Sequence, residues 1–247
     1  MTQRGTAVTS RISPRGALLL AGLAALVIAL VHAGRLSRNS LIGFAVLIPS
    51  IILHEVAHGA MASRLGDDTA RRAGRLTVNP ASHVDLVGTL LVPAMSILAG
   101  WGFIGWAKPV PVDPRQLRHP RNASVAVALA GPATNLVLVA VGYVGFKATF
   151  DAQALSVGIV PLCFYYLGLT NLWLAVLNLL PIPPLDGSAV LERLLPARLW
   201  PEYLKIRHLF FPVLIGIVVV SAVLNLGLLN GLSSWLSDRW NSLLGVV

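Results

Sequence analysis

Two histidines and a glutamate stand close together at positions 54–58, in the order His54, Glu55 and His58. On a helix, residues four apart lie on one face, so both imidazoles can reach one ion while Glu55 stands beside an open coordination position. Ionisable groups are costly in an apolar span, which makes function the default interpretation. The pattern predicts a zinc ion bound by both histidines and a glutamate that transfers protons. Two histidines that only hydrogen-bond to neighbouring helices remain the alternative.

A third protein ligand is needed, because two histidines and a water molecule leave a tetrahedral zinc ion one donor short. The best candidate is Asp186, near the end of the proline-rich stretch 178–187. The prolines cannot continue the preceding helix and Gly187 permits a tight turn, so this carboxylate stands at a helix break. An aspartate before glycine is also common in ordinary turns. The choice of Asp186 therefore depends on whether the topology brings it to the histidines.

The elements that must position these residues lie in a membrane. Of the 247 residues, 55% are hydrophobic and 12% are charged, whereas a soluble domain carries roughly 25% charged residues. Mean hydropathy is +0.75, and several apolar stretches approach the roughly 20 residues that cross a bilayer as a helix. We expect an all-α integral membrane protein that forms one polytopic domain over residues 1–247. The apolar segments are 16–33, 40–63, 86–106, 122–146, 157–180 and 208–230.

The distribution of basic residues predicts the topology. If all six segments cross from a cytoplasmic N-terminus, nine arginines and lysines lie inside and ten outside. If the chain instead enters and returns to the same side near 86–121, fifteen lie inside and four outside. The positive-inside tendency favours this re-entrant or hairpin segment, with about five to six transmembrane helices in total. The same arrangement brings Asp186 to the cytoplasmic side, from which His54 and His58 are approached.

The ends of the chain carry weaker signals. Arginines precede the segment 16–33, and no convincing cleavage site follows it, so we expect a retained helix and not a signal peptide. The tail 232–247 has tryptophan and leucine at mixed helical spacing. It is expected either to lie along the membrane interface or to be a frayed terminus.

Charge and cysteine content exclude other classes. The net charge of +9 comes from short basic clusters between apolar segments, so it indicates membrane topology and not a nucleic-acid partner. Cys163 is the single cysteine, which excludes an intramolecular disulfide and a zinc cluster built from cysteines. The arginine-rich, lysine-poor chain fits a bacterial inner membrane.

Several motifs surround the candidate ligands: HEVAH at 54–58, NPASHVD at 79–85, GWAKPVPV at 105–112, AGPATN at 130–135 and PIPPLDG at 181–187. Together they make the chain resemble the site-2 proteases, which are intramembrane zinc metalloproteases of peptidase family M50. The resemblance covers most of the chain and indicates the minimal form, without a PDZ or CBS domain. It implies that His54, His58 and Asp186 bind Zn²⁺. It also implies that Glu55 is the catalytic acid and base and that Asn135 lies near the site.

Further residues are candidates for lining the site or binding substrate. His83 either lines the site or is a hydrogen-bonded loop histidine, and Asn135 either contacts substrate backbone or bridges helices. The other candidates are Lys108, Pro109, Val110 and Pro111. Alternating prolines exclude a helix here, and an extended edge can add as a strand to an unwound substrate. The expected partners are membrane-spanning proteins in the lipid bilayer.

Two other functions are consistent with polar residues in apolar segments. A polytopic metal or proton transporter could use the histidines and acids as a translocation site. An inactive relative could serve as a binding scaffold, but it would have no chemical need for all four of His54, Glu55, His58 and Asp186. The intact set therefore favours a protease, the function that the resemblance implies.

Overall fold

The computed structural model describes residues 37–83, 85, 108–154, 156–224 and 226–246, with isolated positions between 18 and 34. Most of the apolar segment 16–33 and all of 86–106, where the hairpin was predicted, lie outside the described residues. The chain divides into two compact units. One comprises Met1–Arg35 and Asn79–Lys108, and the other comprises Leu36–Val78 and Pro109–Val247.

The second unit is helical in its described part. Its helices are α2 (Arg38–Arg64), α3 (Thr69–Arg72), α5 (Pro120–Thr149), α6 (Ile159–Asn178), α7 (Gly187–Leu194), α8 (Trp200–Val223) and α9 (Leu228–Leu244). Short 3-10 turns are η3 (Pro114–Gln116) and η4 (Ala197–Leu199), and the first unit contains η1 (Pro80–Ser82). The predicted all-α fold class is confirmed.

Four helices in the part of the chain described are long and apolar enough to cross a membrane: α2, α5, α6 and Trp200–Ser221 within α8. They correspond to four of the six predicted apolar segments. Large apolar side chains are exposed along α5, among them Val137, Val141 and Val144. A hydrocarbon environment suits such a surface better than water does. The chain is therefore an integral membrane protein.

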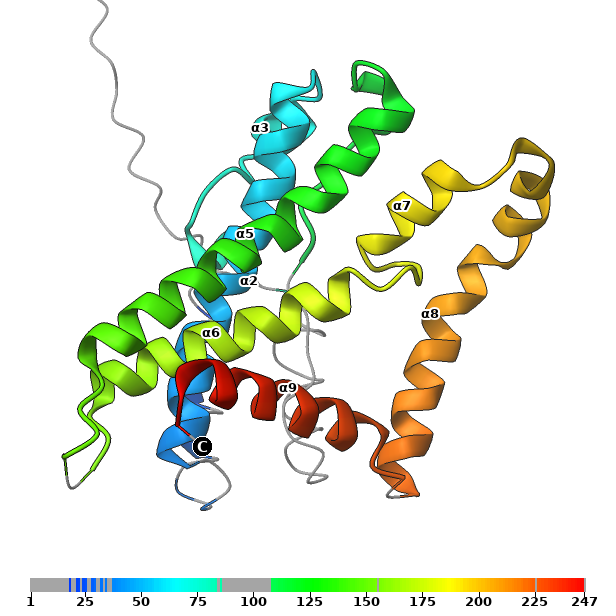
Figure 1. The fold of residues 1–247 in the computed structure, drawn as a ribbon. Helices are drawn as coiled ribbons and strands as arrows, with labels where there is room; N and C mark the ends of the chain where they lie inside the picture. Colours follow the sequence, from blue (N-terminus) through cyan, green and yellow to red (C-terminus); the bar gives the residue numbers. More distant parts are fainter. Residues whose placement is uncertain are drawn as a thin grey trace, which may run out of the picture. The chain divides into compact units, whose positions relative to one another are not determined.

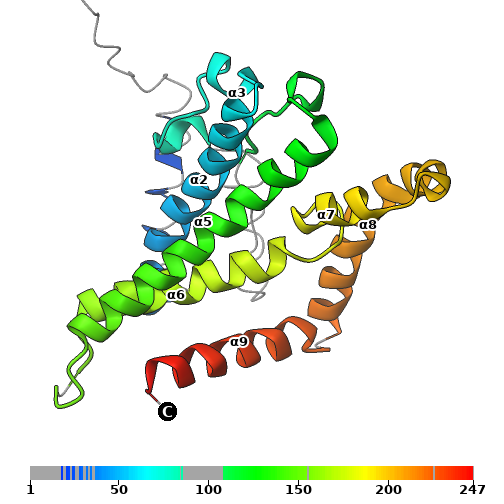
Figure 2. The same ribbon diagram turned by 45° about the horizontal axis from the view of Figure 1, so that its top comes forward.

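Helices α5 and α6 run side by side, and α2 packs against both (Figures 1 and 2). Glycine makes the α5–α6 approach possible: a Cβ atom on Gly142 would meet backbone atoms of Gly168. Helix association in lipid depends on such close packing, because lipid tails are as apolar as the side chains. Helix α2 begins at Ser37, whose Oγ accepts the Ser40 N–H (3.1 Å). These three helices form the frame on which the polar residues are placed.

The C-terminal tail forms helix α9 and is not frayed. Leu236, Trp240 and Leu244 are buried on it, and the last two pack against Phe146 of α5. Lys147 Nζ also donates a hydrogen bond to the Leu244 carbonyl oxygen (3.1 Å), an interaction that suits the negative end of a helix. Its position at a membrane interface remains a prediction.

Candidate metal centre

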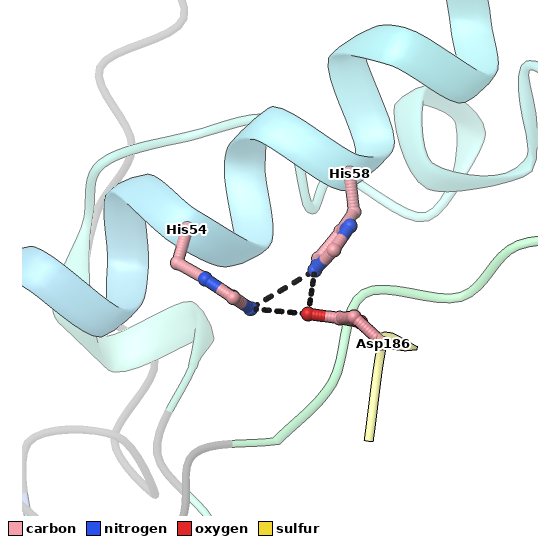
Figure 3. A group of neighbouring side chains, drawn as sticks. All are labelled: His54, His58 and Asp186. Atoms are coloured by element: carbon pink, nitrogen blue, oxygen red, sulfur yellow. Dashed lines mark hydrogen bonds and ion pairs between the residues drawn. The ribbon is translucent and has the colours of Figure 1, made fainter. Parts of the chain in front are cut away.

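Helix α2 carries the two histidines one turn apart and directs both rings to the same side (Figure 3). The exposed fraction is 6% for His54 and 9% for His58. Their Nε2 atoms lie 3.0 Å apart. The spacing of four residues therefore does what the helical pattern predicts, and it places two nitrogen donors together inside the helical frame.

A sharp turn between α6 and α7 brings Asp186 to these rings. A Cβ atom on Gly187 would meet the carbonyl groups of Leu179 and Leu180, so glycine lets the chain fold back on the end of α6. Asp186 Oδ2 lies 3.2 Å from His54 Nε2 and 3.4 Å from His58 Nε2. Three potential ligand atoms from two distant parts of the sequence thus meet at one point (Figure 3).

The three atoms fit a zinc ion. Tetrahedral zinc with bonds of about 2.0–2.1 Å separates its ligand atoms by about 3.3–3.4 Å, close to the three distances above. Asp186 Oδ2 is buried, and no hydrogen-bond donor in the described part of the chain is aligned with it. A buried carboxylate oxygen is unfavourable in that state unless a cation is near. Two imidazoles and one carboxylate also match the donor set of catalytic zinc sites, which keep a fourth position open.

Helix α5 packs against the histidine pair. A Cβ atom on Gly131 would collide with His58 Nε2 and with the His54 ring, so only glycine leaves room for both rings. His58 Nδ1 lies 2.7 Å from the Val127 carbonyl oxygen, and His54 Nδ1 lies 3.1 Å from Asn135 Nδ2. Val127, Gly131 and Asn135 follow each other at intervals of four and so share one face of α5. Asn135 was expected near the site from the family resemblance, whereas Gly131 was not among the predicted residues.

Glu55 lies beside the histidines and contacts the segment 109–112, which contains Pro109 and Pro111. Its Oε2 accepts a hydrogen bond from the Val110 N–H (2.8 Å). Val110 is buried, and its side chain, with that of Leu76, fills the space where Gly59 would carry a Cβ atom. Glycine directly after His58 therefore lets residues 109–112 approach α2 next to the metal centre. This contact was not predicted from the sequence.

The other candidates for lining the site or binding substrate are Pro109, Pro111, His83 and Lys108. Pro109 is exposed and Pro111 is half-buried, on either side of Val110. His83 and Lys108 belong to the first unit, where the Lys108 N–H donates to the His83 carbonyl oxygen (2.9 Å). Substrate binding by these four residues remains a prediction.

Comparison with known proteins supplies the family. Residues 145–221, which include Asp186, match peptidase family M50. YwhC of Bacillus subtilis, a candidate zinc metalloprotease, is 41% identical over 155 residues, which cover 61% of this chain and 67% of YwhC. The chain belongs to peptidase family M50.

Two further relatives carry the same description of candidate zinc metalloprotease. Rip2 of Mycolicibacterium smegmatis is 37% identical over 175 residues, 67% of this chain and 65% of that protein. Rip2 of Mycobacterium tuberculosis is 38% identical over 146 residues, 58% of this chain and 53% of that protein. The chain thus spans about half to two thirds of the length of these relatives. A comparison with solved structures gives no significant match.

Membership of M50 makes the chain a zinc metalloprotease of the membrane, and it identifies Zn²⁺ as the cofactor for which the histidine and aspartate cluster is suited. Neither the family nor these relatives support the transporter that the sequence left open.

Proposed function

We propose that this chain hydrolyses peptide bonds within or near the transmembrane segments of other membrane proteins. The observation that carries the proposal is the convergence of three donor atoms, from His54, His58 and Asp186, inside a frame of membrane-length helices. These residues would hold the zinc ion. When bound there, zinc activates water and polarises the substrate carbonyl group.

Glu55 is the proton carrier in this proposal. Val110 N–H holds Glu55 Oε2, which leaves Oε1 to take a proton from the attacking water and to deliver it to the leaving nitrogen. A carboxylate held at one oxygen is already oriented, so little reorganisation is needed before reaction. The Glu55–Val110 contact thus links the proton carrier to the segment proposed to bind substrate.

Substrate binding is proposed to use the segment 108–112. A transmembrane helix keeps its carbonyl groups in internal hydrogen bonds, so it must unwind before attack. Prolines at 109 and 111 prevent this segment from being helical, and the bond from Val110 brings it to the site. The substrate would then pair with it as an added strand. Stabilising the helix near the scissile bond of a substrate should slow cleavage, and an unchanged rate would contradict strand addition.

The active site is proposed to face the cytoplasm of a bacterial inner membrane, with the N-terminus inside. The distribution of basic residues supports this orientation, since fifteen of them lie inside when the chain returns near 86–121. A reporter fused after Arg121 should be cytoplasmic. An extracytoplasmic reporter would reject the orientation.

The decisive experiment uses purified full-length protein in detergent, with single-span membrane proteins as candidate substrates. Glu55→Gln should abolish cleavage while zinc content and melting temperature stay at wild-type values, because the amide keeps the shape but cannot take up a proton. Glu202→Gln, which changes an exposed glutamate paired with Lys205, should leave both cleavage and zinc content unchanged. Cleavage that survives in Glu55→Gln would be incompatible with the proposed mechanism.

A further inference from the structure

Each histidine of the metal centre has a second ring nitrogen with a partner on α5. His58 Nδ1 lies 2.7 Å from the Val127 carbonyl oxygen, and His54 Nδ1 lies 3.1 Å from the side-chain amide of Asn135. A neutral imidazole that binds a metal through Nε2 carries its hydrogen on Nδ1. Both Nδ1 atoms must then donate, so both partners on α5 must accept.

The two partners differ in what they can do. A backbone carbonyl oxygen only accepts, so Val127 holds His58 in the metal-binding tautomer without any adjustment. The amide of Asn135 offers an acceptor, Oδ1, and a donor, Nδ2, and a half-turn exchanges them with little change in shape. Asn135 is completely buried, and its Oδ1 has no hydrogen-bond partner among the described residues. A half-turn of the Asn135 side-chain amide would therefore bring its acceptor without a partner, Oδ1, to the His54 ring nitrogen that must donate.

We propose that Asn135 Oδ1 accepts the hydrogen bond from His54 Nδ1–H and so holds His54 in the tautomer whose Nε2 binds zinc. The proposal rests on the zinc site of the proposed function. Asn135 is then a positioning residue that acts through His54. Of the two roles considered from the sequence, substrate contact and helix bridging, the structure supports a bridge from α5 to α2 that ends on a histidine of the metal centre.

Local geometry explains why an asparagine stands at this position. Asn135 follows Gly131 by one helical turn, so the residue that leaves room for the rings and the residue that holds one of them share a face of α5. A buried amide in a membrane helix is unfavourable unless it is hydrogen-bonded. The bond to His54 gives Asn135 Oδ1 a partner and orients the ring at the same time.

The test measures zinc affinity by chelator competition on the purified full chain. Asn135→Leu removes the acceptor at similar volume and should weaken zinc binding about 10–100-fold, as is typical when a histidine ligand loses its outer partner. Asn135→Asp keeps an acceptor in either orientation and should bind zinc at least as tightly as the wild type. The visible absorption of Co²⁺ bound in place of zinc should be the same in wild type and Asn135→Asp, which shows that the added carboxylate is not a new ligand.

Asn171→Leu is the matched control. Asn171 is equally buried and also bonds to α2, but through Ser50 and not through a histidine. It should lower stability and leave zinc affinity unchanged. Equal weakening in Asn171→Leu, wild-type affinity in Asn135→Leu, or weakened binding in folded Asn135→Asp would each overturn the proposal. If Asn135→Leu does not fold, the zinc affinity of Asn135→Asp alone decides whether the proposal holds. A wild-type chain that binds no zinc would refute the proposed function itself.

Discussion

Two pairs of polar residues each have one buried member on α2, Ser50 with Asn171 and His54 with Asp186, and they differ in how their hydrogen-bonding groups are satisfied. Ser50 accepts a hydrogen bond from Asn171 Nδ2 (2.9 Å) and donates one to the Val46 carbonyl oxygen (2.8 Å). His54, one turn further on, directs a nitrogen at the other histidine and at Asp186 Oδ2, which has no aligned donor in the described ranges. Ser50 and Asn171 form a bridge between two helices. In the second pair, the lone pairs of His54 Nε2 and Asp186 Oδ2 converge with that of His58 Nε2.

This difference shows what distinguishes a site from a structural contact in a membrane helix. Burial does not separate the two pairs, since Ser50 is 1% and His54 6% exposed. The balance of hydrogen-bond donors and acceptors is what separates the two pairs. In the bridge a donor meets an acceptor, Asn171 Nδ2 and Ser50 Oγ, although Asn171 Oδ1 has no hydrogen-bond partner among the described residues. At the metal centre three acceptors meet, which only a cation or a proton can join. Variants that affect one pair and spare the other can therefore test the assignment.

The largest effect is expected for Gly131→Ala. The new methyl group would occupy the space of His58 Nε2 and of the His54 ring, so the rings must move apart. Loss of the hydrogen-bond partner of a metal-binding histidine typically weakens metal binding about 10–100-fold. Zinc affinity in Gly131→Ala should fall by more than this, and cleavage should disappear. Gly142→Ala is the comparison, because it crowds the backbone of Gly168 and should weaken helix packing but not zinc binding. Wild-type zinc affinity in Gly131→Ala would mean that the rings do not meet as described.

A smaller effect, confined to turnover, is expected for Val110→Pro. Proline has no N–H, so Glu55 Oε2 loses its donor, and a misplaced general base can reduce the rate about 100-fold. Zinc content should not change. Val110→Ala keeps the N–H and trims the buried side chain, so its kcat should stay within a few-fold of wild type. If both variants lose kcat equally, the loss comes from packing and not from the hydrogen bond.

Ser50→Ala should affect stability alone. It removes the bond from Asn171, and hydrogen bonds between transmembrane helices contribute about 1 kcal/mol. The free energy of unfolding in a denaturing detergent should fall by roughly that amount, while zinc affinity and kcat remain unchanged. A loss of zinc in Ser50→Ala would remove the distinction between the two pairs.

The smallest effect is expected at Asp67, a buried acid outside the membrane-spanning helices. Burial raises the pKa of its carboxyl group, but hydrogen bonds from Thr69 and from the Asp113 N–H, together with nearby Arg72, lower the pKa below its ordinary value overall. Because the pKa is lower in the folded state, this stabilisation is complete above the unfolded pKa of about 3.9 and is lost as the pH falls through the folded value. Asp67→Asn should make unfolding less dependent on pH in that acidic range. An unchanged pH dependence would show that the pKa of the Asp67 carboxyl group does not differ between the folded and unfolded protein.

Local spacing made part of this site predictable. His54 and His58 share a helical face because of their separation alone, and Asp186 stands out as an acid at a proline and glycine break. The structure brings their donor atoms together, and their role as ligands remains a prediction. Helix α8 begins at Trp200, earlier than the predicted segment 208–230, because the charged residues of its first turns hide the start of the apolar pattern.

Contacts that depend on the packing register were not predictable in the same way. Gly131 faces the histidines only because α5 takes a particular position against α2. In the same way, Val110 reaches Glu55 only because the segment 109–112 takes a particular position against α2. A single sequence does not fix that register. One signal was nevertheless present: Gly131 stands four residues before Asn135 and therefore on the same face of the helix.

Zinc content of purified Asp186→Ala tests the central assignment most directly, because Asp186 is far in sequence from both histidines and only the fold brings it to them. Wild-type protein and Asp238→Ala, which changes an exposed aspartate of α9, should each contain about one zinc ion per chain. Asp186→Ala should lose that zinc and its cleavage activity while keeping its helical content. Full zinc content and activity in folded Asp186→Ala would contradict the metal centre described for this chain.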